Sequence, residues 1–321
     1  MPDSLIAPYE VPDTMSEDVG MFDIPVAAGK VAVIAHDAGA ANQILHWFSA
    51  GDLDIERAVF SLDGPALAIA RQLFPGLEVC DIERAIREAD WVLCGTGWST
   101  TIEKQAMALA RVAGKIVVAV LDHWVNYPPR FNNPVKPEVD EIWVVDNEAF
   151  TLARSLFPDT RVVRKPGRYL EDQAAHVSSN VQAGQVLFLM EPVRADWPAK
   201  ISGETTVPGE FSAFHFFLSN LRSAKTSVSQ VVIRPHPSDE PDKYLTLLKQ
   251  SDCDVEIRVS DELSLSEALS TAEYVVGLNS YAMVVALAAN KKVYCALPPE
   301  APECLLPHDG ILDLRNVSFG V

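Results

Sequence analysis

Short apolar runs alternate with amphipathic stretches along most of the chain. From residue 30 onward, runs of four to six buried-type residues recur in KVAVIAHD, ERAVFSLD, DWVLCGTG, KIVVAVLDH and EIWVVDN. Such continuous runs are typical of strands that are covered on both faces. Segments with helical periodicity lie between them, for example TTIEKQAMALARVAG, which opens with threonines and closes with glycine. The pattern predicts repeated strand–helix units and hence a parallel, doubly wound sheet.

A second series of the same kind begins near residue 184, with the runs QVLFLMEP, SQVVIRPHP, VEIRVSD, AEYVVGLNS and KKVYCALPP. The stretch between the two series, RKPGRYLEDQAAHVSSNVQAG, gathers Gly, Ser, Asn and charged residues as a connection does. We therefore predict an α/β fold of two Rossmann-like, doubly wound parallel-sheet domains that face a cleft. The expected parts are a flexible N-terminal lead-in (1–28), an N-terminal domain (29–170), a linker (171–183) and a C-terminal domain (184–321).

Composition and charge narrow the classes of function. The 321 residues are 48% hydrophobic and 22% charged, which is ordinary for a globular chain of two domains. The net charge of −18 repels phosphate backbones and anionic lipid surfaces, so we expect no nucleic acid and no membrane surface as a partner. No apolar run approaches the roughly 18 residues of a transmembrane segment. The acidic, proline-punctuated start does not resemble a signal peptide.

The cysteines and histidines show no metal-ligand spacing. The five cysteines, Cys80, Cys94, Cys253, Cys295 and Cys304, form no CxxC motif, and two of them lie inside apolar runs where a thiol packs as a small hydrophobic group. We interpret them as reduced thiols of a cytoplasmic protein. No metal site and no cofactor are expected.

Polar residues gather where the predicted strands end. Ligands of parallel sheets bind at the carboxyl ends of the strands, so these exits are where the chemistry is expected. Several polar strand exits in each of the two predicted domains indicate a cleft between the domains that binds a small molecule. The exits are 36–39, 95–100, 122–124, 191–192, 234–237 and 277–280.

The segment RPHP at 234–237 ends a predicted strand with a histidine between two prolines. Pro235 and Pro237 fix the backbone on both sides of His236 and stop the strand, so the imidazole is presented from a stiff turn. Such a histidine can donate to a phosphate and stabilise it as a leaving group. The alternative is a turn whose histidine only hydrogen-bonds a backbone carbonyl.

The segment GLNS at 277–280 ends another strand and opens YAMVVALAAN. Asn279 or Ser280 would occupy the N-cap region of that helix, where free N–H groups and the helix dipole favour an anion. Alone, this is equally consistent with an ordinary helix cap. Together with RPHP in the same predicted domain, it indicates a phosphate site.

These two motifs resemble those of a known family. RPHP, followed about 40 residues later by GLNSYAMVVALAANKKVY at 277–294, resembles the His-Pro motif and the serine-bearing helix start of bacterial sialyltransferases and polysialyltransferases. Related patterns occur in Kdo transferases and in enzymes that move polyol phosphates from CDP-linked donors. The two-domain organisation is similar to that of GT-B glycosyltransferases. Asn279 stands where the family has a second serine.

The resemblance implies a glycosyltransferase that moves a CMP-linked acidic sugar, sialic-acid-like or Kdo-like, onto a hydroxyl acceptor with inversion. The C-terminal domain would bind the nucleotide-sugar donor, and the N-terminal domain a carbohydrate or glycoprotein acceptor. The alternatives are a CDP-polyol phosphotransferase, a nucleotide-sugar epimerase of the same architecture, or a non-catalytic sugar- or nucleotide-binding protein. The donor-binding residues implied are Arg234, His236, Gly277, Asn279, Ser280 and Glu191, the last for a ribose hydroxyl or the cytosine amine.

An inverting transfer needs a base on the acceptor side, and Asp37, just past the first strand, is the first candidate. Asp122 and His123 are the alternatives, and Asp37 is also consistent with a simple N-cap role. Aromatic faces beside hydrogen-bonding groups are how proteins bind sugars. The acceptor-binding candidates are Asn42, Gly97, Trp98, Ser99, Thr100, Trp124, Asn126 and Arg130, the last as a fork for an acidic sugar's carboxylate.

Overall fold

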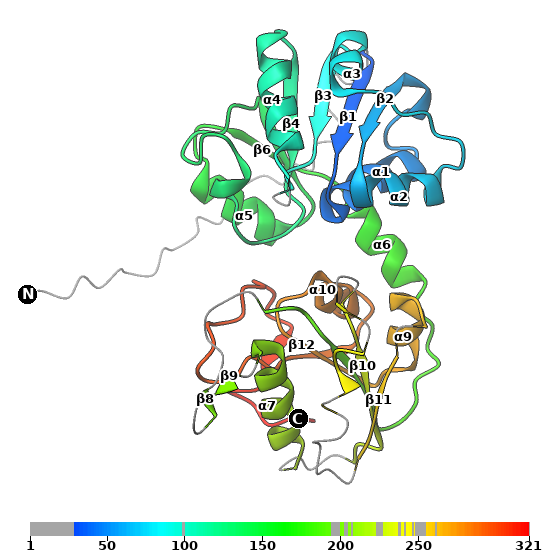
Figure 1. The fold of residues 1–321 in the computed structure, drawn as a ribbon, viewed down its shortest axis with the longest axis vertical. Coiled ribbons are helices and arrows are strands. Elements are labelled where there is room, and N and C mark those ends of the chain that lie inside the picture. The colour runs from blue at the N-terminus through cyan, green and yellow to red at the C-terminus, as the bar shows by residue number, and fades with distance from the viewer. Residues whose placement is uncertain are drawn as a thin grey trace, which may run out of the picture.

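The computed structural model describes residues 29–97, 100–193, 200–201, 205–206, 208–222, 227–236, 239–240, 242–245, 247, 255–260 and 262–320. They form two six-stranded parallel sheets with helices around them (Figure 1). Four of the sequence predictions fall outside the described residues: the lead-in 1–28, the sugar contacts Trp98 and Ser99, the second proline of RPHP, and the reduced thiol of Cys253.

The first sheet has the strand order β2-β1-β3-β4-β5-β6. Side chains alternate between its two faces, as strand geometry requires. In β1, Val31, Val33 and Ala35 join the core under α1 and α2, whereas Ala32 and Ile34 join the core under α3, α4 and α5. The strands are β1 Val31–Ala35, β2 Ala58–Leu62, β3 Trp91–Cys94, β4 Ile116–Val120, β5 Glu141–Val144 and β6 Arg161–Arg164. The helices are α1 Ala38–Ser49, α2 Gly64–Leu73, α3 Ile82–Glu88, α4 Ile102–Val112 and α5 Asn147–Leu156, with short 3-10 turns η2 Ile55–Arg57 and η3 Pro128–Arg130.

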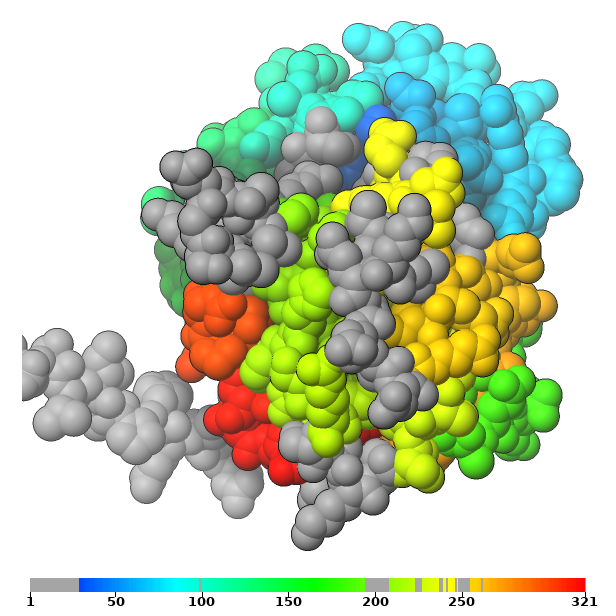
Figure 2. All heavy atoms as spheres, turned by 60° about the horizontal axis from the view of Figure 1, so that its bottom comes forward, coloured from blue at the N-terminus to red at the C-terminus, as the bar shows by residue number. Residues whose placement is uncertain are grey.

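The second sheet has the order β11-β10-β7-β12-β13-β14. Its strands are β7 Gln185–Leu189, β10 Gln230–Arg234, β11 Glu256–Val259, β12 Tyr274–Gly277, β13 Lys292–Cys295 and β14 Ile311–Asp313. Its described helices are α7 Gly209–Arg222, α9 Leu265–Thr271 and α10 Tyr281–Ala288, and a small hairpin pairs β8 Lys200–Ile201 with β9 Thr205–Thr206. In Figure 2 this second domain, lime to red, faces the viewer, with the first domain behind and above it.

All ten predicted strands are confirmed, and the doubly wound fold class with them. The order of connection reverses between β1 and β3 in the first sheet and between β7 and β12 in the second. Such reversals leave a crevice at the strand ends where ligands of these folds bind. The fold therefore offers one crevice per domain.

The chain passes from β6 to β7 through α6 (Arg168–Ala175), which lies between the domains in Figure 1. This helix packs against α1 of the first domain and α10 of the second. Part of the predicted linker is thus a packed helix. Among the described residues, no helix has the length and apolar character needed to cross a bilayer.

Candidate active site between the domains

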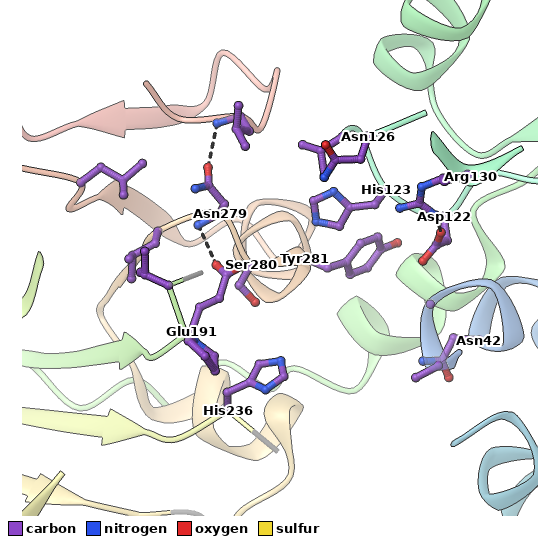
Figure 3. Close-up of a pocket in the computed structure, with 18 of the residues that line it drawn as sticks. Asn42, Asp122, His123, Asn126, Arg130, Glu191, His236, Asn279, Ser280 and Tyr281 are labelled. Carbon is purple, nitrogen blue, oxygen red and sulfur yellow. Dashed lines mark hydrogen bonds and ion pairs between the residues drawn. The ribbon is translucent and has the colours of Figure 1, made fainter. Parts of the chain in front are cut away.

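A cavity of about 730 Å³ lies between the two domains, within the size range of small-molecule sites (Figure 3). Its walls come from both sheets' crevices. The first domain and α6 contribute Ala38, Gly39, Asn42, Gln43, Asp122, His123, Val125, Asn126, Arg130 and Tyr169. The second domain contributes Glu191, Pro192, Val193, His236, Leu278, Asn279, Ser280, Tyr281, Leu297, Pro302, Glu303 and Leu305. The structure thus brings together the predicted residues Asn42, Asp122, His123, Asn126, Arg130, Glu191, His236, Asn279 and Ser280.

His236 reaches the cavity from the end of β10, as the RPHP motif predicts. Its backbone N–H donates to Asp239 Oδ2 over 2.9 Å. The Asp239 side chain is only 2% exposed and also accepts bonds from the Tyr244 hydroxyl and Lys243 Nζ, each 2.7 Å away. The turn that presents the imidazole is therefore anchored by a buried carboxylate, an anchor that the sequence reasoning missed.

The end of β12 and the start of α10 form the neighbouring wall. Ser280 is the N-cap of α10, and its hydroxyl accepts the Ala282 N–H over 3.3 Å. The Asn279 N–H donates to Glu191 Oε2 over 3.0 Å, which joins the exits of β12 and β7. Burial raises the pKa of the Glu191 carboxyl, and the Asn279 N–H offsets part of that rise. Glu191 is therefore a partly desolvated carboxyl beside a helix N-terminus.

Two predicted donor contacts lie elsewhere. An Nη of Arg234 donates to the carbonyl of Leu263, so the guanidinium turns toward the segment before α9. A Cβ on Gly277 would meet the Met283 sulfur at 2.8 Å, which places this glycine against α10. Neither residue belongs to the lining of the cavity.

Asp122 faces the cavity from the end of β4 and forms an ion pair with Arg130. Arg130 is 4% exposed and also donates to the carbonyl and hydroxyl of Thr96, at 3.1 and 3.3 Å. A Cβ on Gly39 would lie 1.6 Å from Asp122 Oδ2, so α1 can approach this carboxylate only with glycine at that position. The Arg130 guanidinium, predicted to bind a sugar carboxylate, is thus already bonded to Asp122 and orients that side chain.

His123 connects the two domains. Burial lowers the pKa of its imidazole, although the neighbouring Asp122 carboxylate opposes that shift. Its Nδ1 accepts the Trp124 N–H over 3.0 Å, and the ring also bonds the backbone of Asn279. A neutral ring that accepts at Nδ1 carries its proton on Nε2. His123 is therefore a hydrogen-bond donor across the cleft near neutral pH.

Asp37, the first candidate for the base, is not part of the cavity lining. It occupies the N-cap position of α1 without a side-chain cap bond, and its Oδ1 pairs with His36 Nδ1 at 2.8 Å. A Cβ on Gly97 would lie 2.5 Å from Asp37 Oδ2, so Gly97 makes room for this carboxylate. Glu103, fully buried, accepts the His36 N–H over 2.9 Å. Asp37 thus belongs to a cluster at the crevice between β1 and β3.

The remaining acceptor candidates separate in the structure. Asn42 and Asn126 line the cavity, whereas Thr100, like Gly97, does not. Trp124 is 4% exposed and stacks on Tyr281 with ring centroids 5.5 Å apart and planes 17° apart. Its Nε1 donates to Asp146 Oδ2 over 2.9 Å. Trp124 therefore lies in the seam between the domains rather than facing the cavity as a sugar platform.

The structure adds lining residues that the sequence reasoning did not single out. Tyr281 accepts a bond from Gln43 Nε2 over 3.1 Å, and its ring lies 5.7 Å from that of Tyr169. Tyr281 directly follows Ser280, so its position in the first turn of the predicted helix could have indicated that it lies at the site. Tyr169 fell in the predicted connection, where nothing marked it.

One group in the described part of the chain has the spacing of a metal site. Ligand atoms of Asp146, Glu148 and His308 lie within 4.8 Å of one another. Asp146 is already used as the N-cap of α5, where it accepts the Ala149 N–H over 2.6 Å. The group lies outside the cavity lining.

The comparisons with known proteins concern the fold. No protein-family model and no curated protein sequence matches the chain. The structure is similar to that of S. aureus MnaA with UDP, at TM-score 0.53 and 12% identity, over 83% of this chain and 78% of that one. It is similar to the UDP-GlcNAc 2-epimerase from Neisseria meningitidis bound to UDP-GlcNAc, at TM-score 0.52 and 12% identity, over 79% and 78%. The UDP-GlcNAc 2-epimerase from Methanocaldococcus jannaschii matches at TM-score 0.50 and 12% identity, over 83% of each chain. The chain therefore has the GT-B-like two-domain α/β fold.

Proposed function

We propose that this protein is a nucleotide-sugar glycosyltransferase that moves a CMP-linked acidic sugar, sialic-acid-like or Kdo-like, onto a hydroxyl acceptor with inversion. The observation that carries the proposal is the convergence of His236 and the N-terminus of α10 on one wall of the inter-domain cavity (Figure 3). An imidazole and the positive end of a helix dipole form a compact site for one phosphate.

The charges of the wall support a donor with a single phosphate. Among the described lining residues, Arg130 is the only arginine or lysine, and it pairs with Asp122. A diphosphate would ask for further cations, because each phosphate oxygen bears charge that a desolvated site must match. Glu191, close to the same helix start, supports contacts to the hydroxyls or amine of a nucleoside.

The geometry favours Asp122 over Asp37 as the base, because Asp122 lines the cavity from the acceptor side. In the proposed reaction its carboxylate takes the proton of the acceptor hydroxyl, and that oxygen attacks the anomeric carbon on the face opposite the departing CMP. His236 and the N–H groups of α10 stabilise the charge on the leaving phosphate. Since Arg130 is engaged, the carboxylate of an acidic sugar would be bound by the amides of Asn42 and Asn126.

The proposal is tested by thermal-shift titration with CMP, CDP, UDP and GDP. A ligand that binds only the folded state raises the melting temperature. We expect CMP to stabilise the protein more than CDP, UDP and GDP do, because it alone carries a single phosphate, and His236→Ala to lose about 1.5–3 kcal/mol of binding free energy. His176→Ala is the matched control, since His176 is exposed on α6 and outside the lining. Equal responses to all four nucleotides would contradict a CMP-type donor.

A second candidate is a nucleotide-sugar epimerase, favoured by the fold likeness to two UDP-GlcNAc 2-epimerases. An epimerase converts its nucleotide sugar without an acceptor. NMR of UDP-GlcNAc incubated with the protein alone separates the two, because appearance of the 2-epimer supports this candidate. Binding without any turnover, for nucleotide sugars with and without acceptors, would indicate a non-catalytic binding protein.

A further inference from the structure

Two cysteines lie behind the donor wall, and the proposed reaction uses neither. Cys295 is the last residue of β13 and is fully buried, and Cys304 is partly exposed in the segment between β13 and β14. Both thiols donate to one oxygen, the carbonyl of Leu278, at 3.4 Å from Cys295 and 3.6 Å from Cys304. The shared acceptor, together with a side-chain hydrogen bond between the two thiols, makes the sulfurs neighbours.

Of the two thiols, Cys304 is the one that loses its proton more readily. The hydrogen bond from Cys295 lowers the pKa of the Cys304 thiol, burial opposes that shift, and the backbone N–H of Leu306 adds to it. The same bond raises the pKa of Cys295. The single S–H of Cys295 can donate either to the Leu278 oxygen or to the Cys304 sulfur. Cys304 therefore forms the thiolate, which is the reactive form, more readily than an ordinary cysteine does.

The location connects this pair to the cavity. Leu278 lines the cavity and directly precedes Asn279 and Ser280. On the other side of Cys304, the Leu305 N–H donates to Asn279 Oδ1 over 2.7 Å, a bond drawn in Figure 3. The two sulfurs thus sit where the start of α10 meets the segment 302–305 of the cavity wall.

We propose that Cys295 and Cys304 form a modification site at which a hydroperoxide produces an intramolecular disulfide. The Cys304 thiolate attacks one oxygen of hydrogen peroxide, the O–O bond breaks, and the departing hydroxide takes up a proton to become water. Cys304 is then a sulfenic acid. The Cys295 sulfur attacks the Cys304 sulfur, the S–S bond forms, and the S–OH group leaves as a second water with the Cys295 proton. Two thiols are oxidised and one peroxide is reduced.

This inference goes beyond the proposed function and does not rest on it. A disulfide of this kind is transient in a reducing compartment, as redox-sensing disulfides are. It is consistent with thiols that are reduced in the structure, where the four described cysteines are all free.

Reactivity is the first test. Cys80 is the internal control, because it is also partly exposed, while burial raises the pKa of its thiol. At pH 7 we expect iodoacetamide to modify Cys304 about 5- to 10-fold faster than Cys80, since a larger thiolate fraction outweighs the lower nucleophilicity of a more acidic thiol. Equal rates at the two residues would overturn the proposal.

The disulfide itself is the second test. The whole protein is treated with stoichiometric hydrogen peroxide, remaining thiols are blocked, and the chain is cut after glutamate. Because Glu300 and Glu303 lie between the two cysteines, their fragments stay joined only through a disulfide. We expect the joined pair, separated by dithiothreitol, in the native protein and in Cys80→Ser, and its loss in Cys304→Ser and Cys295→Ser. Unjoined fragments, or a disulfide between two copies of the chain, would overturn the proposal.

Discussion

At the scale of single residues, two side chains that face the cavity are held in place by buried partners. Asp239 anchors the backbone of His236, and Arg130 orients Asp122. Burial alone would raise the pKa of Asp239, but bonds from Lys243, Tyr244 and the His236 N–H hold that pKa below its usual value. The positions of the two proposed functional groups therefore depend on buried charge pairs.

Asp239→Asn tests this anchor. Because the pKa of Asp239 is lower in the folded state, its carboxylate stabilises the fold above the unfolded pKa of about 3.9 and loses that effect as pH falls through the folded value. We expect Asn to lower the free energy of unfolding by about 1–3 kcal/mol at pH 7. Urea unfolding from pH 7 to pH 3 should show this difference shrinking below about pH 4. Asp309→Asn, at an exposed site, should show no such difference.

Asp122→Asn and Asp37→Asn together locate the base. We expect Asp122→Asn to keep the donor-induced thermal shift and to lower turnover by roughly 10²–10⁴-fold, because the proton acceptor is lost. The variant should also be less stable, because the buried Arg130 loses its ion-pair partner. Asp37→Asn should retain turnover, since Asp37 lies outside the lining. Turnover is divided by the folded fraction in each variant. A loss confined to Asp37→Asn would return the role to Asp37.

At the scale of elements, the sequence pattern predicts those strands and helix starts that depend only on neighbouring residues. The ten predicted strands and the start of α10 follow from apolar runs and cap residues. β6 was not predicted because arginines flank its only two valines, and β14 because it has three residues. The pattern does not distinguish α6 from a connection, because this helix has no buried residue, and its position depends on packing against α1 and α10.

The site divides in the same way. Strand exits could be predicted, because each follows directly from an apolar run, and they include His236, Glu191 and Ser280. The contact between Gln43 and Tyr281 could not, because it joins residues 238 positions apart. The bonds of Arg130 to Thr96 could not be predicted from the sequence pattern either, because they depend on β3 and β4 being neighbours in the sheet.

Two helix caps offer a matched pair of variants. Ser264 caps α9 in a reciprocal capping box with Glu267, and Ser280 caps α10 at the cavity. Either serine changed to alanine should destabilise the fold by about 0.5–2 kcal/mol, measured by urea unfolding. Only Ser280→Ala should also weaken the thermal shift with CMP, because only that helix start faces the cavity. An equal effect of both variants on nucleotide binding would speak against a phosphate at α10.

At the scale of the whole molecule, an aromatic seam joins the domains. The Tyr281 ring of α10 lies 5.5 Å from the Trp124 ring of the first domain and 5.7 Å from the Tyr169 ring of α6. His308 of the second domain meets Trp124 edge-on at 4.6 Å. The seam borders the cavity, since Tyr169 and Tyr281 also line it. Closure of the domains and the shape of the site therefore depend on the same rings.

Variants at Tyr281 test the seam. Tyr281→Ala removes the ring between Trp124 and Tyr169, and we expect a loss of about 3–5 kcal/mol of stability together with a larger radius of gyration in small-angle scattering. Tyr281→Phe keeps the stacking and removes only the hydroxyl bonded to Gln43, so its radius should match that of the native protein. An unchanged radius in Tyr281→Ala would mean that other contacts hold the domains together.

The two domains are connected through α6, and this connection determines how strongly the aromatic seam must bind to keep them closed. A short flexible tether holds two domains at an effective concentration of about 1 mM, and a helix that already packs on both domains holds them at no less. A seam that would dissociate at about 10 µM between separate fragments then keeps the tethered domains closed about 99% of the time, and losing 1.4 kcal/mol lowers this to about 90%. Weak contacts are enough to close this molecule, and small changes in them set how often the cavity exchanges its contents with solvent.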